Sequence, residues 1–252
     1  MAGHSKWHNI QHRKAAVDKK RGKYWTKCAR AIQSAARQGG PDPTSNVILR
    51  YAIDEARYAN MPKDTIQRAI DKATGAASQD NFESVTYEGY GPAGAAMLIL
   101  ALTDNRTRTA GDLRLLLGKY GGNLGVSGAV SYMFGTRGQI IVAAGKKTPD
   151  QVIEIAIDAG ALDVHEPEDA TADGAMWTVL SDPTQFQKVK DALEAGGLTV
   201  EAAEIARIPR ETSPLTGDDA RKMTLLVDAL EDLDDVQKVY SNVEIADESG
   251  KR

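Results

Sequence analysis

The feature that most constrains the fold of this 252-residue chain is a change of hydrophobic period near Phe82. Before it, apolar residues recur three or four positions apart, as over 49–56, which is typical of amphipathic helices. After it, short apolar runs such as 95–103 alternate with helical patterns, and this predicts strands separated by helices. The sequence therefore predicts an α+β fold with an all-helical N-terminal part.

Glycine and proline divide the helical part into segments. Gly22 is interpreted as a kink, or as a join from an earlier helix over about residues 7–20. The polar residues at 42–44 offer cap chemistry for a following helix. A break at 60–62 precedes the last helix, and Met61, expected to be exposed there, is a candidate contact with a partner.

The order of the expected elements predicts three domains. Residues 1–78 are expected to form a basic helical domain. Over residues 136–207 the elements follow a β-α-β-β-α-β order, which is a ferredoxin-like plan. The segment 82–135, with a strand expected at 129–134, shows half of that plan, and the rest follows at 208–246. We therefore expect two ferredoxin-like α+β domains, one of them inserted in the other.

Positive charge is concentrated at the N-terminal end. Residues 1–75 carry 15 Lys or Arg and 6 acidic residues, whereas the remainder carries 16 and 29. Because self-repulsion disfavours such a concentration unless a polyanion compensates it, the pattern indicates nucleic-acid binding. A merely solvated helix face is the alternative. The candidate nucleic-acid-binding residues are Lys6, Trp7, Arg13, Lys14, Lys19, Lys20, Arg21, Lys23, Lys27, Arg30 and Arg37.

Helical spacing places Lys23, Lys27 and Arg30 on one face of the expected helix. Trp7 and Trp25 are candidates for stacking on bases, and packing in the core is an equal alternative for Trp25. The sequence holds no zinc finger, basic zipper or other base-reading motif, so contacts to phosphate are expected to dominate.

Arg106 and Arg108 are candidates for a secondary phosphate contact, because they stand where a helix is expected to begin. The structural alternative is a helix start capped by Asp104 or Thr109. Residues 136–252 carry 12 basic and 24 acidic side chains and should repel nucleic acid. They are expected to face solvent, a basic protein or the chain's own basic helices.

The sequence favours no catalytic, metal or cofactor site. The single cysteine, Cys28, stands in a helical apolar pattern and is expected to be a small buried side chain. The string over 89–94 matches a dinucleotide-binding fingerprint by letter, but it leads into a strand and is interpreted as a turn. His4, His8 and His12 are expected to meet phosphate or solvent rather than a metal. Neither a membrane span nor a signal peptide is recognised, and a cytoplasmic protein is expected.

Several strings of the sequence carry a family resemblance. They are Ala2-Gly3-His4-Ser5-Lys6-Trp7, His12-Arg13-Lys14-Ala15-Ala16, Asn60-Met61-Pro62-Lys63-Asp64, Tyr87-Glu88-Gly89-Tyr90-Gly91-Pro92, Thr103-Asp104-Asn105 with Arg108-Thr109, and Gly121-Gly122-Asn123-Leu124-Gly125. Together they resemble the YebC/PmpR family, to which the mitochondrial translational activator of cytochrome oxidase is related. The resemblance implies three domains and no catalytic activity.

The resemblance and the charge pattern lead to two hypotheses. The first is a non-enzymatic regulator that binds DNA through the basic helical domain and controls transcription. The alternative is a ribosome-associated translation factor that binds ribosomal RNA or tRNA and relieves stalling at difficult sequences such as proline runs. Phosphate chemistry is common to both targets, so the sequence alone leaves both open.

Overall fold

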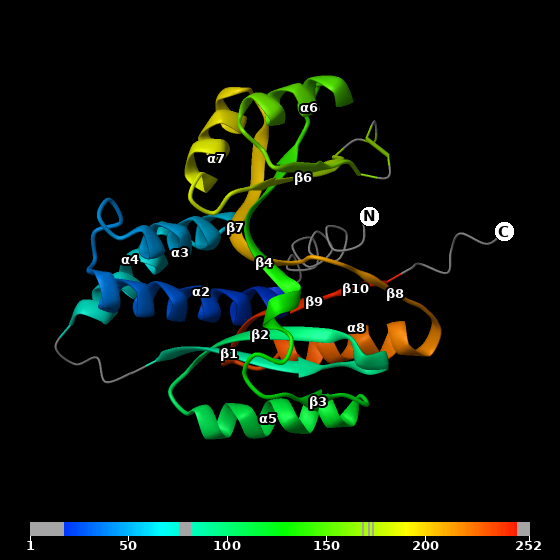
Figure 1. The fold of residues 1–252 in the computed structure, drawn as a ribbon. Helices are drawn as coiled ribbons and strands as arrows, with labels where there is room; N and C mark the ends of the chain where they lie inside the picture. Colours follow the sequence, from blue (N-terminus) through cyan, green and yellow to red (C-terminus); the bar gives the residue numbers. More distant parts are fainter. Residues whose placement is uncertain (1–17, 76–81, 168, 171, 173, 246–252) are drawn as a thin grey trace. The chain divides into compact units, whose positions relative to one another are not determined.

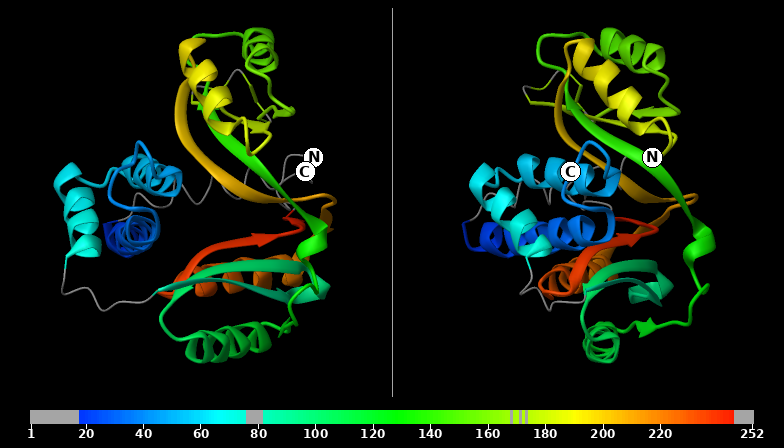
Figure 2. Two further views of the ribbon diagram at one scale, coloured as in Figure 1. Left: turned by 60° about the vertical axis from the view of Figure 1, so that its left-hand side comes forward. Right: turned by 90° about the vertical axis from the view of Figure 1, so that its left-hand side faces the viewer.

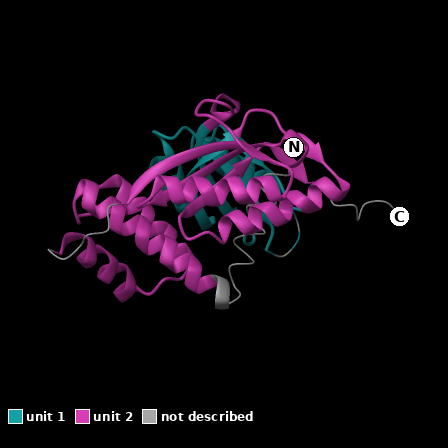
Figure 3. Cartoon of the chain, turned by 90° about the horizontal axis from the view of Figure 1, so that it is seen from below, with its two compact units in different colours: residues 1–14, 136–208 teal, residues 15–135, 209–252 magenta. Residues whose placement is uncertain are grey.

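The computed structural model of this chain describes residues 18–75, 82–167, 169–170, 172 and 174–245. It has an α+β fold. The described residues divide into two compact units, one over 136–208 and the other over 18–135 and 209–245 (Figure 3). Within the described residues, no helix is both long enough and apolar enough to cross a bilayer.

The helical part of the larger unit is a bundle of α2 (Asp18–Gly39), α3 (Val47–Tyr58) and α4 (Lys63–Thr74) (Figures 1 and 2). Gly22 lies inside α2, so the expected kink or join at this residue was wrong. A glycine inside a helix costs only about 1 kcal/mol relative to alanine, and the neighbouring helix-forming residues outweigh it. Most of the helix expected over 7–20 falls outside the described residues.

The bundle has a hydrophobic core of its own. Its buried side chains come from all three helices and include Ile32, Leu49 and Ile70. Cys28 belongs to this core, as expected, and burial raises the pKa of its thiol. Met61 is also buried there, only 5% exposed, so its expected role as an exposed partner contact was wrong. Burial of its apolar side chain in the core is favoured over exposure to solvent, because it removes apolar surface from water.

Asn46, rather than the residues at 42–44, caps α3. Its Oδ1 accepts a hydrogen bond from the Leu49 backbone N–H, and its Nδ2 donates to the Ala35 and Gly40 carbonyls. A Cβ atom at Gly39 would approach Nδ2 to 2.6 Å, so this close approach requires glycine. One side chain thus satisfies the end of α2 and the start of α3.

The α+β part of the larger unit contains an antiparallel sheet (Figure 1). Its strand order is β3-β1-β2-β9, with α5 (Arg106–Lys119) and α8 (Gly217–Glu231) in contact with each other. The strands are β1 (Glu83–Tyr90), β2 (Ala96–Thr103), β3 (Asn123–Leu124) and β9 (Val236–Ser241). The short 3₁₀ turn η1 (Pro92–Gly94) joins β1 to β2, which confirms the turn expected from the string over 89–94.

Two features of this part differ from the sequence-based expectation. Instead of a strand over 129–134, a 3₁₀ turn η2 (Ser131–Met133) leads into one long strand, β4 (Phe134–Ala143). The short strands β8 (Ser213–Leu215) and β10 (Val243–Ile245) form a parallel pair that the sequence did not predict. The element order is therefore β1-β2-α5-β3 followed by α8-β9, not β-α-β-β-α-β.

The smaller unit contains the second four-stranded sheet. Its elements are β4, α6 (Pro149–Asp158), β5 (Asp163–His165), β6 (Met176–Ser181), α7 (Phe186–Ala195) and β7 (Thr199–Pro209). The strand order β5-β6-β4-β7 is that of a ferredoxin-like sheet, and α6 contacts α7. Trp177, Phe186 and Ile140 are fully buried in its core.

The loop between β3 and β4 is held by one buried carboxylate. Glu88 of β1 accepts hydrogen bonds from the backbone N–H groups of Gly128, Val130 and Ser131, at 2.7–2.8 Å. Burial opposes ionisation of this side chain, but the three N–H groups outweigh it and hold the pKa of Glu88 below its ordinary value. The ionised carboxylate therefore organises a glycine-containing loop that has little regular structure.

We predict that Glu88→Gln lowers the free energy of unfolding by about 2 kcal/mol, because an amide NH₂ meets backbone donors that are left unpaired. Hydrogen exchange of the amides at 128, 130 and 131 should accelerate in the same variant. These hydrogen bonds favour the ionised form of Glu88, which is why its pKa is lowered. Their contribution to the free energy of unfolding is therefore present above a pH of about 4 and is lost as the pH falls through the folded-state pKa.

The matched control is Glu83→Gln, on the same strand. Glu83 is exposed and pairs with Arg106 at the surface, so its loss should cost less than about 1 kcal/mol. Unchanged exchange at the three amides in Glu88→Gln would contradict the role given to this carboxylate.

Candidate nucleic-acid interface

The candidate nucleic-acid-binding residues differ in how exposed their side chains are. Lys6, Trp7, Arg13 and Lys14 lie outside the described residues, and Lys19 and Lys20 belong to the first turn of the helix. Arg21 and Lys23 are exposed, Arg30 and Arg37 are half-buried, and Lys27 is only 8% exposed.

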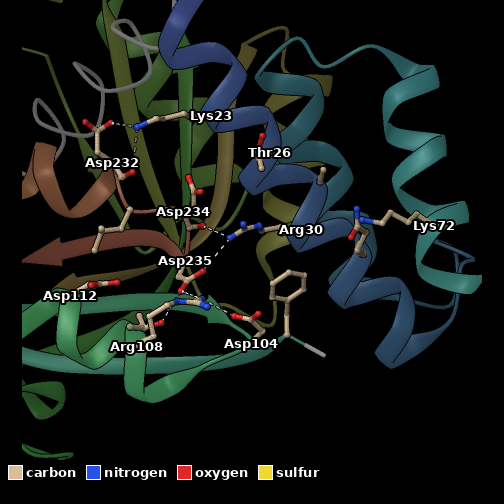
Figure 4. A pocket seen from close by; sticks show the side chains of 15 residues that line it. Lys23, Thr26, Arg30, Lys72, Asp104, Arg108, Asp112, Asp232, Asp234 and Asp235 are labelled. Atoms are coloured by element: carbon tan, nitrogen blue, oxygen red, sulfur yellow. Dashed lines mark hydrogen bonds and ion pairs between the residues drawn. The ribbon is translucent and has the colours of Figure 1, made fainter. Parts of the chain in front are cut away.

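Three of these cations meet the turn between α8 and β9. This turn, Glu231–Asp235, holds four acidic residues and is named the acidic turn below. The Lys23 Nζ lies 3.4 Å from Oδ1 of Asp232 (Figure 4). The Lys27 Nζ donates a hydrogen bond to the backbone carbonyl of Glu231. Helical spacing therefore does align these cations, and they face the chain's own acidic residues.

Arg30 contacts two residues of the acidic turn. Its guanidinium donates to the Asp234 carbonyl at 2.8 Å and lies 3.3 Å from Oδ1 of Asp235 (Figure 4). The same guanidinium lies 5.3 Å from the ring centroid of Phe82, a cation–π distance. For Lys27, burial lowers the pKa of the ammonium, and the charges of Glu231, Asp232 and Asp234 oppose this effect. The acidic turn thus offsets part of the effect of burial on this lysine, and the pKa stays lowered.

Asp235 joins four elements through one carboxylate. Its Oδ2 accepts from Arg108 at 2.6 Å, from the Thr109 hydroxyl at 2.8 Å and from the Thr103 hydroxyl at 3.2 Å, while Oδ1 faces Arg30. The side chain is 12% exposed, and burial alone would raise its pKa. The hydrogen bonds and the charge of Arg108 outweigh burial, so the pKa of Asp235 is lowered.

Arg106 and Arg108 are both paired with carboxylates. Arg106 Nε lies 2.6 Å from Glu83, and Arg108 lies 2.7 Å from Asp104 in addition to its contact with Asp235. The cap of α5 is Asn105, whose side chain accepts from the Arg108 backbone N–H, rather than Asp104 or Thr109. As placed, these arginines stabilise the start of α5, and the secondary phosphate contact stays a prediction.

Trp25 packs in the bundle rather than standing free for a base. Its indole Nε1 donates to the Ala59 carbonyl at 2.9 Å, and its ring borders the bundle core. Tyr24 beside it donates to Glu55 at 2.9 Å, and Glu55 also accepts from Lys238 of β9 at 3.0 Å. The aromatic residues of α2 therefore serve packing.

A cavity of about 890 Å³ opens between α2 and the acidic turn (Figure 4). Its lining mixes both signs of charge, with Lys23, Arg30 and Lys72 opposite Asp104, Asp112 and Asp232. The sequence feature that could have indicated this contact is the group of four acidic residues within 231–235. The charge pattern alone does not show that these residues lie against α2.

These observations define the class of protein: an α+β protein whose basic helical bundle bears a cationic helix face. Comparison with known proteins identifies its family. Residues 5–76 match the TACO1/YebC protein N-terminal domain, and residues 82–243 match the TACO1/YebC second and third domain. The chain belongs to the TACO1/YebC family, which confirms the resemblance seen in its motifs.

Relatives of known name and structure agree with this assignment. A "probable transcriptional regulatory protein" of Burkholderia multivorans is 52% identical over 98% of this chain and 100% of its own length. A protein of Burkholderia thailandensis with the same description is 51% identical over the same shares. The crystal structure of a conserved hypothetical protein from Aquifex aeolicus has a TM-score of 0.83 and 42% identity, covering 94% of this chain and 96% of that one.

We predict that Asp235→Asn lowers the free energy of unfolding by about 2 kcal/mol at neutral pH, because charge-assisted hydrogen bonds from Arg108 and the two threonines lose their anion. Because the pKa of Asp235 is lowered in the folded protein, this stabilisation is present at pH values above the ordinary pKa range of Asp. It is lost as the pH falls through the folded-state pKa. Urea denaturation at several pH values measures it.

Asp234→Asn is the matched control, because Asp234 is exposed and offers Arg30 its backbone carbonyl. Its stability should stay within about 0.5 kcal/mol of the parent protein. Equal losses in the two variants would contradict the anchoring role of Asp235.

Proposed function

We propose that this protein is a non-enzymatic regulator that binds nucleic acid through its basic N-terminal segment, with control of transcription through DNA as its role. The carrying observation is the ten Lys and Arg residues within the first 37 positions against one acidic residue, Asp18. Such a segment neutralises phosphates and releases their counterions, which supplies affinity without base reading. The names of the Burkholderia relatives support a regulatory role.

The fold supports this proposal through α2. This helix of 22 residues carries seven of the ten cations, from Lys19 to Arg37, and Lys6, Arg13 and Lys14 precede it, so a long rigid element presents most of the charge. Its opposite side is fixed by the bundle core through Ile32, and Arg21 and Lys23 stand exposed near its start. A helix anchored on one side and cationic on another can lie along a sugar-phosphate backbone.

We predict binding to duplex DNA that weakens steeply with salt. If about five phosphates are neutralised, the log–log slope of affinity against salt is roughly −4.5 for a duplex and −3.5 for a single strand. Fluorescence polarisation of a labelled duplex at several salt concentrations measures the slope. Affinity independent of salt would contradict the electrostatic proposal.

The triple variant Lys19→Gln/Lys20→Gln/Arg21→Gln should reduce the magnitude of this slope by about one for each lost phosphate contact. The matched control is Lys63→Gln/Arg68→Gln/Lys72→Gln, which removes the same charge from exposed positions on α4 of the same bundle. Equal losses in both variants would mean that net charge, rather than the N-terminal turn of α2, governs binding.

The nature of the target is decided in cell lysate. Crosslinking followed by recovery of particular promoter DNA supports transcriptional control. Migration with ribosomes in a sucrose gradient, together with crosslinks to ribosomal RNA, would replace it by the translational role.

A further inference from the structure

We propose that the acidic turn, Glu231–Asp235, is a built-in competitor for the cationic face of α2, and that a nucleic acid displaces it on binding. This inference rests on the proposed function and concerns its regulation. The contact joins residues about 200 positions apart, at Lys23, Lys27 and Arg30, so it is a property of the folded unit rather than of local sequence.

The acidic turn offers the same chemistry as a phosphate backbone. Lys23, Lys27 and Arg30 stand at i, i+4 and i+7 on one helix face, and each meets an oxygen of the turn. The acceptors are carbonyl and carboxylate oxygens, and the turn carries four negative charges within five residues. A phosphate backbone presents anionic oxygens in a similar row, so the two ligands compete for the same donors.

The strength of this contact varies along α2. Lys23 and Asp232 are 51% and 62% exposed, and an exposed ion pair of this kind changes an equilibrium constant by at most about fivefold. Arg30 and Asp235 are much less exposed, at 23% and 12%. The contact should therefore open first at Lys23, next to the exposed Arg21.

The bundle is able to separate from the turn without losing its own core. The buried cluster that holds α2, α3 and α4 together draws its residues from positions 28–73. The contacts of α2 with the acidic turn, and of Glu55 with Lys238, are polar. Polar contacts between packed parts are weaker barriers to relative motion than a shared hydrophobic core.

The first test uses zero-length carbodiimide crosslinking of the full-length chain. Lys23 and Asp232 are close enough to form an amide in the free protein, and the yield of this crosslink should fall as a fluorescent duplex DNA saturates the protein. The pair Lys222–Asp218, 2.7 Å apart within α8, is the internal control whose yield should not change. Both products are quantified by peptide mass spectrometry.

The outcomes separate the inference from the proposed function. An unchanged Lys23–Asp232 yield at saturating duplex would overturn the inference and leave the proposed function in place. Polarisation that shows no binding at low salt would overturn the proposed function, and the inference with it.

The second test compares two double variants of equal charge. Asp232→Asn/Asp234→Asn should tighten duplex binding about three- to fivefold, in keeping with the loss of one exposed ion-pair contact. Asp218→Asn/Asp219→Asn removes the same charge from the other end of α8 and should change affinity less than about twofold. Equal tightening in both would show that overall charge, rather than displacement of the turn, is responsible and would overturn the inference.

Discussion

The buried carboxylate of Asp235 is the contact on which the larger unit depends. It is held by hydroxyl groups of β2 and α5, by Arg108 of α5 and by Arg30 of α2, so several elements meet at one anion. An anion in such a place is costly unless it is paired, and its hydrogen bonds with Arg108, Thr103 and Thr109 fix how β2 and α5 meet the start of β9. The same residue ends the acidic turn, so the anchor of the sheet and the partner of the cationic helix are one structural feature.

Much of the fold follows from local patterns in the sequence. The helical repeats place Leu49, Ile53 and Ile70 in the core of the bundle because spacing on a helix decides which side chains share a face. The run over 129–134 was misjudged because Glu88, forty residues earlier, imposes a turn there through backbone N–H groups. The pairing of β8 with β10 is likewise set by distant partners, and strands of three residues leave almost no local signal.

The candidate interface was predicted less completely than the fold. Periodicity placed Lys23, Lys27 and Arg30 on one face, because helix geometry alone determines that arrangement. What lies against the face depends on a turn some 200 residues away in sequence. Composition left solvent, a basic protein and the chain's own basic helices open as the surroundings of the acidic region 136–252, and it did not single out residues 231–235. Trp25 shows the same limit, since its hydrogen bond to Ala59 decides between packing and stacking only once α3 is in position.

The smaller unit is entered and left at neighbouring points. The backbone N–H of Arg210, just after β7, donates to the carbonyl of Met133, just before β4, at 2.8 Å. This hydrogen bond joins the segment that leads into the smaller unit to the segment that leaves it. Segments with adjacent ends are those at which domain insertion is tolerated. The stretch between these two residues can therefore be lengthened, shortened or replaced during evolution without loss of the hydrogen bonds in the sheet of the larger unit. The two segments of the larger unit would still pair with each other.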